Sequence, residues 1–247
     1  EYVDFESEAQ FSAYNAVANH EELPDYEEAL SLHINGVSDT PIIDFLAFGE
    51  VSEALLLESG NYSLDLTYTA DNTPLLSNHL LSLLENTNKT IFFYAEEEYI
   101  DEDGDGDIDE DGDGRIDEIE ITVNSLVVDN SPNESIYSHQ MTVINLIDQD
   151  EIVDDFTNIK VYFVRSDEII ETTEQYLTAI FAKPSTVELL NNTYTVYVIG
   201  KLDSSDIILT STKLMLNEDS ETQFIILEKD DNTSTGYKMT FANQTSE

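Results

Sequence analysis

Residues 193–199 read Thr-Tyr-Thr-Val-Tyr-Val-Ile, and this stretch decides the fold class because β-branched and aromatic residues fill it in alternating positions. A period of two is typical of a β-strand, whose successive side chains point to opposite faces of a sheet. Residues 61–69 (Asn-Tyr-Ser-Leu-Asp-Leu-Thr-Tyr-Thr) follow the same pattern. Further runs of this kind are found at residues 30–36, 90–94, 118–123, 141–144, 159–164, 222–227 and 237–241. Helical spacing is convincing nowhere: residues 75–84 could form a short helix, but their position favours a strand. The sequence therefore indicates an all-β protein.

The sequence also repeats itself at a nearly constant offset. Residues 60–66 match residues 192–198, which lie 132 positions later. Three collinear matches support a duplication: residues 90–93 with 222–225, residues 74–77 with 207–210, and residues 11–17 with 141–147. The polar, proline-containing stretch 129–135 is the predicted seam. We therefore predict two tandem antiparallel β-sandwiches, Ig-like or transthyretin-like, over residues 1–130 and 131–247.

Composition narrows the possible functions. The 247 residues include 53 acidic and 9 basic side chains, a formal net charge of −44. That charge excludes non-specific nucleic-acid binding and disfavours anionic membranes. The absence of cysteine excludes disulfides, thiolate metal sites and a cysteine nucleophile. A hydrophobic fraction of 40% argues against a disordered acidic chain, and no apolar run is long enough to span a membrane.

The most specific motif is an acidic stretch of two eight-residue units at residues 101–120. Calcium prefers six to eight oxygen ligands, and a calcium loop supplies them at positions 1, 3, 5, 7, 9 and 12, with glycine at position 6. In a frame that starts at Asp109, every position matches, with Gly114 at the bend and Glu120 as the bidentate ligand. The remaining predicted ligands of this loop are Asp111, Asp113, the carbonyl of Arg115, and Asp117, directly or through water.

A second frame starts at Asp101 and lacks its final glutamate. Its predicted ligands are Asp101, Asp103, Asp105, the carbonyl of Asp107, and Asp109, which could serve both ions. Position 12 is Gly112, so Asp111, Asp113 or water would have to replace the missing carboxylate. A competing frame from Asp107 ends correctly at Glu118 but puts a glycine in the apolar position, and it ranks lower. We expect one or two Ca²⁺ ions, and we disfavour magnesium because it prefers a tight octahedron and keeps its waters.

The context of this loop differs from that of a calcium sensor. Predicted strands flank it on both sides, so there are no helices to open. The equivalent connection in the second repeat, residues 229–236, is short. The loop is therefore predicted to be an insertion in one hairpin, similar to thrombospondin type 3 repeats and dockerin loops. The alternative is a solvated acidic loop, although 15 acids and one base in residues 96–120 would repel one another without cations.

Motifs of the first half resemble the DUF4397 family of secreted bacterial and archaeal proteins. They are residues 14–18 (Tyr-Asn-Ala-Val-Ala), 32–36 (Leu-His-Ile-Asn-Gly), 46–52 (Leu-Ala-Phe-Gly-Glu-Val-Ser), 57–62 (Leu-Glu-Ser-Gly-Asn-Tyr) and 73–76 (Thr-Pro-Leu-Leu). In the second half the likeness is weak, because residues 177–182 (Leu-Thr-Ala-Ile-Phe-Ala) replace the Phe-Gly core of the motif. The resemblance implies tandem sandwich-like domains outside the cytoplasm and carries no catalytic residues to transfer.

Other candidate features favour structural roles. The four histidines (His20, His33, His79 and His139) show neither metal-ligand spacing nor a Ser-His-Asp arrangement. Residues 96–98 (Glu-Glu-Glu) could extend the cation site, but a solvated strand end is favoured. The 13 tyrosines could form a glycan-binding platform, but packing in the core and on strand surfaces is favoured.

These observations predict a non-enzymatic, calcium-stabilised structural protein, either secreted or at the cell surface, that is a candidate subunit of an extracellular filament or layer. The alternative is a monomeric adhesin-type module that recognises a glycan or a surface protein. We expect self-association or another surface protein as the partner, and neither nucleic acid nor membrane insertion. Residues 1–7 and 237–247 are the segments expected to exchange strands with neighbours.

Overall fold

The computed structural model describes residues 8–17, 29–35, 40–100, 119–130, 135–148, 157–202, 205–221, 223–230 and 232–243. These residues form sixteen β-strands and no helix, which confirms the all-β prediction. The strands are β1 (Glu8–Ala16), β2 (Leu30–Ile34), β3 (Ile43–Leu46), β4 (Leu55–Glu58), β5 (Gly60–Tyr68), β6 (Pro74–Leu83), β7 (Asn88–Tyr99), β8 (Ile119–Asp129), β9 (Ser138–Asn145), β10 (Thr157–Arg165), β11 (Tyr176–Thr178), β12 (Ser185–Leu190), β13 (Asn192–Leu202), β14 (Ser205–Leu216), β15 (Gln223–Lys229) and β16 (Tyr237–Asn243). The described residues hold no helix that could cross a membrane.

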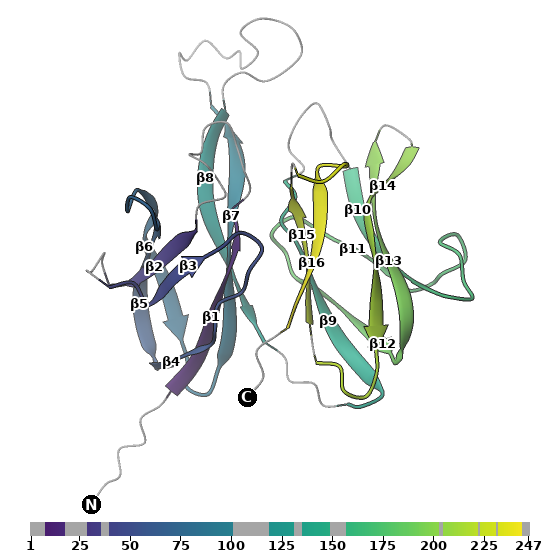
Figure 1. Ribbon diagram of the computed structural model, residues 1–247, viewed down its shortest axis with the longest axis horizontal. Helices are drawn as coiled ribbons and strands as arrows, with labels where there is room; N and C mark the ends of the chain where they lie inside the picture. The colour runs from purple at the N-terminus through teal and green to yellow at the C-terminus, as the bar shows by residue number, and fades with distance from the viewer. Residues whose placement is uncertain are drawn as a thin grey trace, which may run out of the picture. The chain divides into compact units, whose positions relative to one another are not determined.

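Two four-stranded sheets build each domain, and the second domain repeats the first strand for strand (Figure 1). In the first domain the strand orders are β4-β1-β7-β8 and β3-β2-β5-β6. In the second they are β12-β9-β15-β16 and β11-β10-β13-β14, so each strand has a counterpart eight strands earlier. The two compact units meet in sequence between Ser131 and Pro132, inside the predicted seam. The tandem sandwich architecture is thus the product of a duplicated topology.

Each domain departs from the predicted antiparallel pattern in one strand pair. β1 runs parallel to β7, and β9 runs parallel to β15. All other pairs whose register is described are antiparallel. The first strand of each domain lies between a short edge strand and a late strand of the same sheet. Alternation alone does not encode strand direction, which is why the sequence pattern did not predict this pairing.

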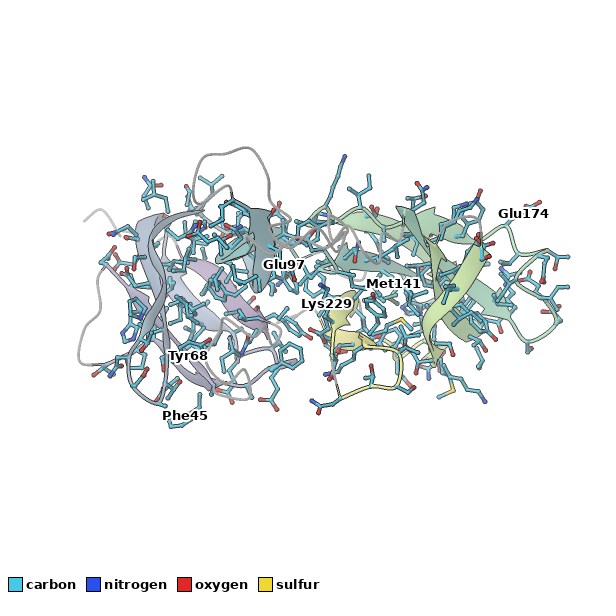
Figure 2. The ribbon with its side chains drawn as sticks, turned by 90° about the horizontal axis from the view of Figure 1, so that it is seen from above. Phe45, Tyr68, Glu97, Met141, Glu174 and Lys229 are labelled. Carbon is cyan, nitrogen blue, oxygen red and sulfur yellow. The ribbon has the colours of Figure 1, made fainter. Side chains whose placement is uncertain are left out.

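Alternating side chains of the two sheets meet in a separate core in each domain. The first core includes Phe11, Leu32, Leu64, Leu66, Ile91 and Phe93, and the second includes Met141, Val161, Phe163, Val196, Val198 and Ile225. Tyr68 in the first domain and Met141 in the second are buried (Figure 2). At roughly 25 cal/mol per Å² of apolar surface removed from water, such cores are the main source of stability for each sandwich.

The predicted offset of 132 holds for some strands and not for others. Leu66 and Val198 are equivalent core residues, as the offset predicts. However, Ile91 pairs with Ala13 and Ile225 pairs with Val143, so the true offset between β7 and β15 is 134. The predicted match of residues 90–93 with 222–225 is therefore wrong by two residues. A slip of two keeps every side chain on the same face, so the hydrophobic pattern could not reveal it.

A buried asparagine at the end of the first strand recurs in both domains. Asn15 and Asn145 are each at most 1% exposed. Their Nδ2 atoms donate to the carbonyl oxygens of Leu46 (3.1 Å) and Ala179 (3.2 Å), which end or follow the third strand of each domain. Each Oδ1 accepts a backbone N–H from two residues later at 3.0 Å. The two side chains thus satisfy buried backbone groups where the chain leaves the sheet.

The same asparagines hold a residue in the left-handed conformation. The backbone carbonyl of Asn15 accepts the N–H of Gly49 at 2.8 Å, and that of Asn145 accepts the N–H of Ala182 at 2.8 Å. Gly49 has a φ of 77° and Ala182 has a φ of 49°. An L-residue with a Cβ is strained there, whereas glycine is not.

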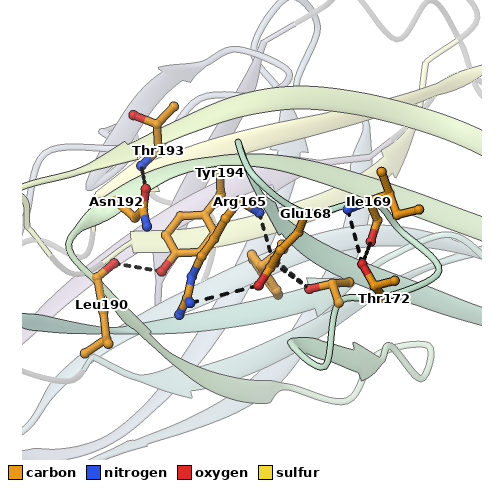
Figure 3. Close-up of polar contacts among 10 residues, drawn as sticks. Arg165, Glu168, Ile169, Thr172, Leu190, Asn192, Thr193 and Tyr194 are labelled. Atoms are coloured by element: carbon orange, nitrogen blue, oxygen red, sulfur yellow. Dashed lines mark hydrogen bonds and ion pairs between the residues drawn. The ribbon is translucent and has the colours of Figure 1, made fainter.

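A tyrosine fixes the corner between the fourth and fifth strands of each domain. The hydroxyl of Tyr62 donates to the carbonyl of Glu58, and that of Tyr194 donates to the carbonyl of Leu190 at 2.9 Å (Figure 3). In each case the acceptor lies four residues before the tyrosine. This arrangement corresponds to the tyrosine corner of Ig-like sandwiches, where the ring packs in the core and the hydroxyl closes the turn.

Candidate functional site

The predicted calcium loop lies between β7 and β8, which are neighbours in one sheet of the first domain. Both strands are anchored in the core, β7 by Phe93 and β8 by Val123. At the other end of the hairpin, Lys89 Nζ donates to Asp129 Oδ1 at 2.7 Å. A well-anchored pair of strands therefore carries the acidic segment.

The equivalent hairpin of the second domain has a short turn. Lys229 pairs with Tyr237 across β15 and β16. Between them, the N–H of Asp230 donates to the carbonyl of Gly236 at 2.9 Å, and Gly236 adopts a φ of 77°. The acidic segment is therefore an addition to one of two equivalent hairpins.

Most of the predicted ligands lie outside the described residues. These are Asp101, Asp103, Asp105, Asp107, Asp109, Asp111, Asp113, Arg115 and Asp117. Glu120 is described: it is an exposed residue of β8. Because Val123 faces the core, alternation puts Glu120 on the opposite face of the sheet. No group of three acidic or histidine side chains suited to a metal ion occurs among the described residues, and the calcium loop stays a prediction.

The three glutamates at the end of β7 do not act alike. The carboxylate of Glu97 lies 3.4 Å from Lys229 Nζ, and its backbone N–H donates to Asp148 Oδ2 at 3.3 Å. Glu96 is half-buried and Glu98 is exposed. A lysine ammonium therefore already engages Glu97, which matches neither the predicted solvated strand end nor a free cation ligand.

The described histidines bond to hydroxyl and amide groups. His79 Nε2 lies 2.7 Å from Ser125 Oγ, which joins the edge strands β6 and β8 of the two sheets. Burial lowers the pKa of His79 from its ordinary value. His139 is fully buried and its Nε2 lies 2.7 Å from Asn191 Oδ1. His20 lies outside the described residues. These contacts stabilise strands and corners.

An acidic side chain in the second domain is likewise fully engaged. Glu168 Oε2 accepts the backbone N–H of Arg165 at 3.3 Å and the hydroxyl of Thr173 at 3.2 Å (Figure 3). Its Oε1 lies 4.0 Å from Arg165 Nη1. This carboxylate orders the connection between β10 and β11.

The structure also reveals a surface that the sequence reasoning did not identify. On the outer face of the sheet β11-β10-β13-β14, Tyr162 lies between Tyr176 and Tyr197, each directly opposite it in register. Three lysines flank this row, since Lys160, Lys201 and Lys213 also alternate with core-facing residues. We call these six residues the lysine–tyrosine face. Alternation could have assigned each residue to an outer face, but only the strand register brings them together.

Comparisons with known proteins add little to this description. No family model matches the chain, and no curated protein matches it. Among solved structures, a DUF3823 family protein from Bacteroides ovatus ATCC 8483 matches 85% of this chain and 100% of its own, at 13% identity and a TM-score of 0.19. A likeness at that TM-score carries no argument about fold or function. The resemblance to the DUF4397 family stays a prediction.

Proposed function

We propose that this chain is a non-enzymatic, calcium-stabilised structural protein that is secreted or exposed at the cell surface. We further propose that it is a subunit of an extracellular filament or layer. The resemblance of the first half to the DUF4397 family supports the extracellular location. The repetition of one strand order in both domains is consistent with a structural role.

The observation that carries the proposal is the difference between the two equivalent hairpins. The β15–β16 turn is short, whereas the β7–β8 connection contains a stretch that matches a calcium loop at every position from Asp109 to Glu120. Carboxylates are the hard oxygen ligands that calcium prefers. Bound calcium would neutralise the local negative charge and hold the acidic side chains together.

Calcium that binds only the folded chain adds stability of RT ln(1 + [L]/Kd). At a calcium concentration one hundred times the Kd, this amounts to about 2.7 kcal/mol. For a chain of this size, such a gain corresponds to roughly 5–10 °C in melting temperature. At about 1 mM extracellular calcium, this gain requires a Kd of about 10 μM, and a weaker site would add less stability.

The test is calorimetry of the full chain in calcium, in magnesium and in a chelator, together with the variants Asp113→Asn and Glu120→Gln. We expect calcium to raise the melting temperature of the wild type by several degrees more than magnesium does. Each variant removes one ligand charge and should abolish most of this gain. Glu188→Gln is the matched control, because Glu188 is an exposed strand residue and its substitution changes the net charge equally.

A melting temperature that is the same in calcium and in chelator would refute the calcium part of the proposal. An equal loss of the calcium response in Glu188→Gln would show that total charge matters and that the loop does not. The structural part is tested by electron microscopy and light scattering in calcium, where ordered assemblies are expected. The extracellular location is tested by fractionation of the producing cells.

A monomeric adhesin-type binding module is the second candidate function. The lysine–tyrosine face favours it, because Tyr176 is 50% exposed and three lysines lie on the same sheet. This alternative predicts saturable binding of a glycan or surface protein with no self-association.

A further inference from the structure

The charge of one sheet differs sharply from that of the rest of the chain. The strands β10, β11, β13 and β14 together contain four of the nine basic residues and one of the 53 acidic residues. The basic residues are Lys160, Arg165, Lys201 and Lys213, and the acidic one is Asp206. The equivalent sheet of the first domain contains Asp44 and Asp65 and no basic residue. The sheet of the second domain is therefore basic, whereas its counterpart in the first domain has no basic residue and one exposed acidic residue, Asp44.

The outer face of this sheet presents hydrogen-bond donors. Tyr162 and Tyr176 stack with ring centroids 5.2 Å apart, and Lys160 Nζ lies 5.3 Å from the centroid of the Tyr176 ring. The six side chains of the lysine–tyrosine face form no hydrogen bond or ion pair with any residue that the structure describes. Lys201 and Lys213 are exposed, and Tyr176 is half-exposed. The face thus offers ammonium and phenol groups that can donate to carboxylates.

We propose that the lysine–tyrosine face is the surface through which one copy of this chain binds the acidic surface of a second copy. The proposal rests on the self-association proposed above. Charge complementarity selects the occupant, because the chain outside this sheet carries 52 of its 53 acidic residues. The contact joins two different surfaces, so repeated copies add in one direction and produce a filament unless the rotation closes a ring.

The repulsion between two chains of charge −44 does not prevent this contact at physiological salt. At about 0.15 M ionic strength the Debye length is about 8 Å, so only charges near the interface act on one another. At low salt the net repulsion extends further, and at about 1 M salt the ion pairs of the interface are screened. Association is therefore expected to be strongest at intermediate salt.

The experiment compares Lys213→Glu with Lys183→Glu in the full chain, with the molar mass measured by light scattering across protein and salt concentrations in calcium. Both lysines are exposed, and both substitutions change the net charge by the same amount, but Lys183 lies outside the four strands of this sheet. We expect the dissociation constant for self-association to rise by about tenfold or more in Lys213→Glu, because like charges then face each other. Lys183→Glu should associate as the wild type does. Tyr176→Ser should weaken association without any change in charge.

Four outcomes would overturn the inference. If Lys213→Glu self-associates as strongly as the wild type does, the contact lies elsewhere, and the proposed structural function stays intact. If the wild type stays monomeric at every salt concentration, the proposed contact does not exist. The calcium melting experiment then tests the calcium-stabilised part of the proposed function separately. A monomer that binds polygalacturonate, and loses that binding in Lys213→Glu, would make the occupant an acidic glycan. If the chain is monomeric and Lys213→Glu lowers its melting temperature whereas Lys183→Glu does not, the occupant of the face is an acidic segment of the same chain.

Discussion

Ala182 holds a backbone conformation that costs the second domain stability. Its φ of 49° lies in the left-handed region, and its N–H donates to the carbonyl of the buried Asn145 at 2.8 Å. The equivalent residue of the first domain is Gly49, which has a φ of 77° and makes the same bond to Asn15. Only one of the two domains therefore has the residue that suits this position.

The expected effect of exchanging the two residue types follows from two opposing terms. A Cβ in the left-handed region costs roughly 1–2 kcal/mol. Glycine, in turn, loses about 0.4–1 kcal/mol more than alanine in conformational entropy when the chain folds. The first term is larger, so Ala182→Gly should stabilise the second domain by about 1 kcal/mol. Gly49→Ala should destabilise the first domain by about the same amount.

Differential scanning calorimetry of the full chain measures both changes. For a domain of this length, 1 kcal/mol corresponds to about 4 °C in melting temperature. Ala179→Gly is the control, because Ala179 is 2% exposed and is not among the left-handed residues. That control should lower the melting temperature. If Ala182→Gly also lowered it, or left it unchanged, the strain assigned to Ala182 would be refuted.

Three further variants test other contacts. Tyr194→Phe should destabilise the second domain by about 1 kcal/mol, measured by urea unfolding, whereas Tyr197→Phe should have little effect because its hydroxyl has no partner among the described residues. Asn145→Ala leaves two buried backbone groups unpaired and should lower the free energy of unfolding by about 2 kcal/mol or more in the same assay. The folded-state pKa of His79 is lowered by burial, so the unfolded chain binds its proton more readily. The contribution of neutral His79 to the free energy of unfolding is therefore complete above the unfolded pKa of about 6.5, and it is lost as pH falls below that value. Between pH 8 and pH 5 the melting temperature should therefore fall less steeply for His79→Gln than for the wild type. The same fall in both proteins would contradict this assignment.

Sequence alone predicted the features that depend on local alternation. The strands around Leu66 and Val198 follow from a period of two, and the duplication follows from the collinear matches between the two halves. The sequence did not predict the parallel pairing of β1 with β7, because strand direction depends on which distant strand is the neighbour. The two-residue error between Ile91 and Ile225 has a related cause, since it leaves every side chain on its expected face.

The two candidate sites differ in the same respect: one depends on consecutive residues and the other on which strands are neighbours. The calcium loop is a continuous motif, so its ligands could be assigned from spacing, and Glu120 is the one assigned residue that the structure describes. The lysine–tyrosine face is discontinuous. Tyr162, Tyr176 and Tyr197 belong to three strands, and nothing in the spacing of the residues shows that they are opposite one another. The substitution of Ala182 for the glycine of the first domain was visible in the sequence, but its strained backbone was not.

The position of β1 determines how the first domain responds to tension along its chain. Gln10, near the start of β1, pairs with Asn88, and the N–H of Asn130, just after β8, donates to the carbonyl of that same residue at 2.9 Å. The polypeptide thus enters and leaves the domain beside one residue. A force that pulls these two points apart loads the hydrogen bonds between β7 and the edge strand β8 one after another, so we expect β8 to peel away at low force. In an assembly under load, the contacts between surfaces would have to carry the tension, because the covalent chain through this domain transmits it poorly.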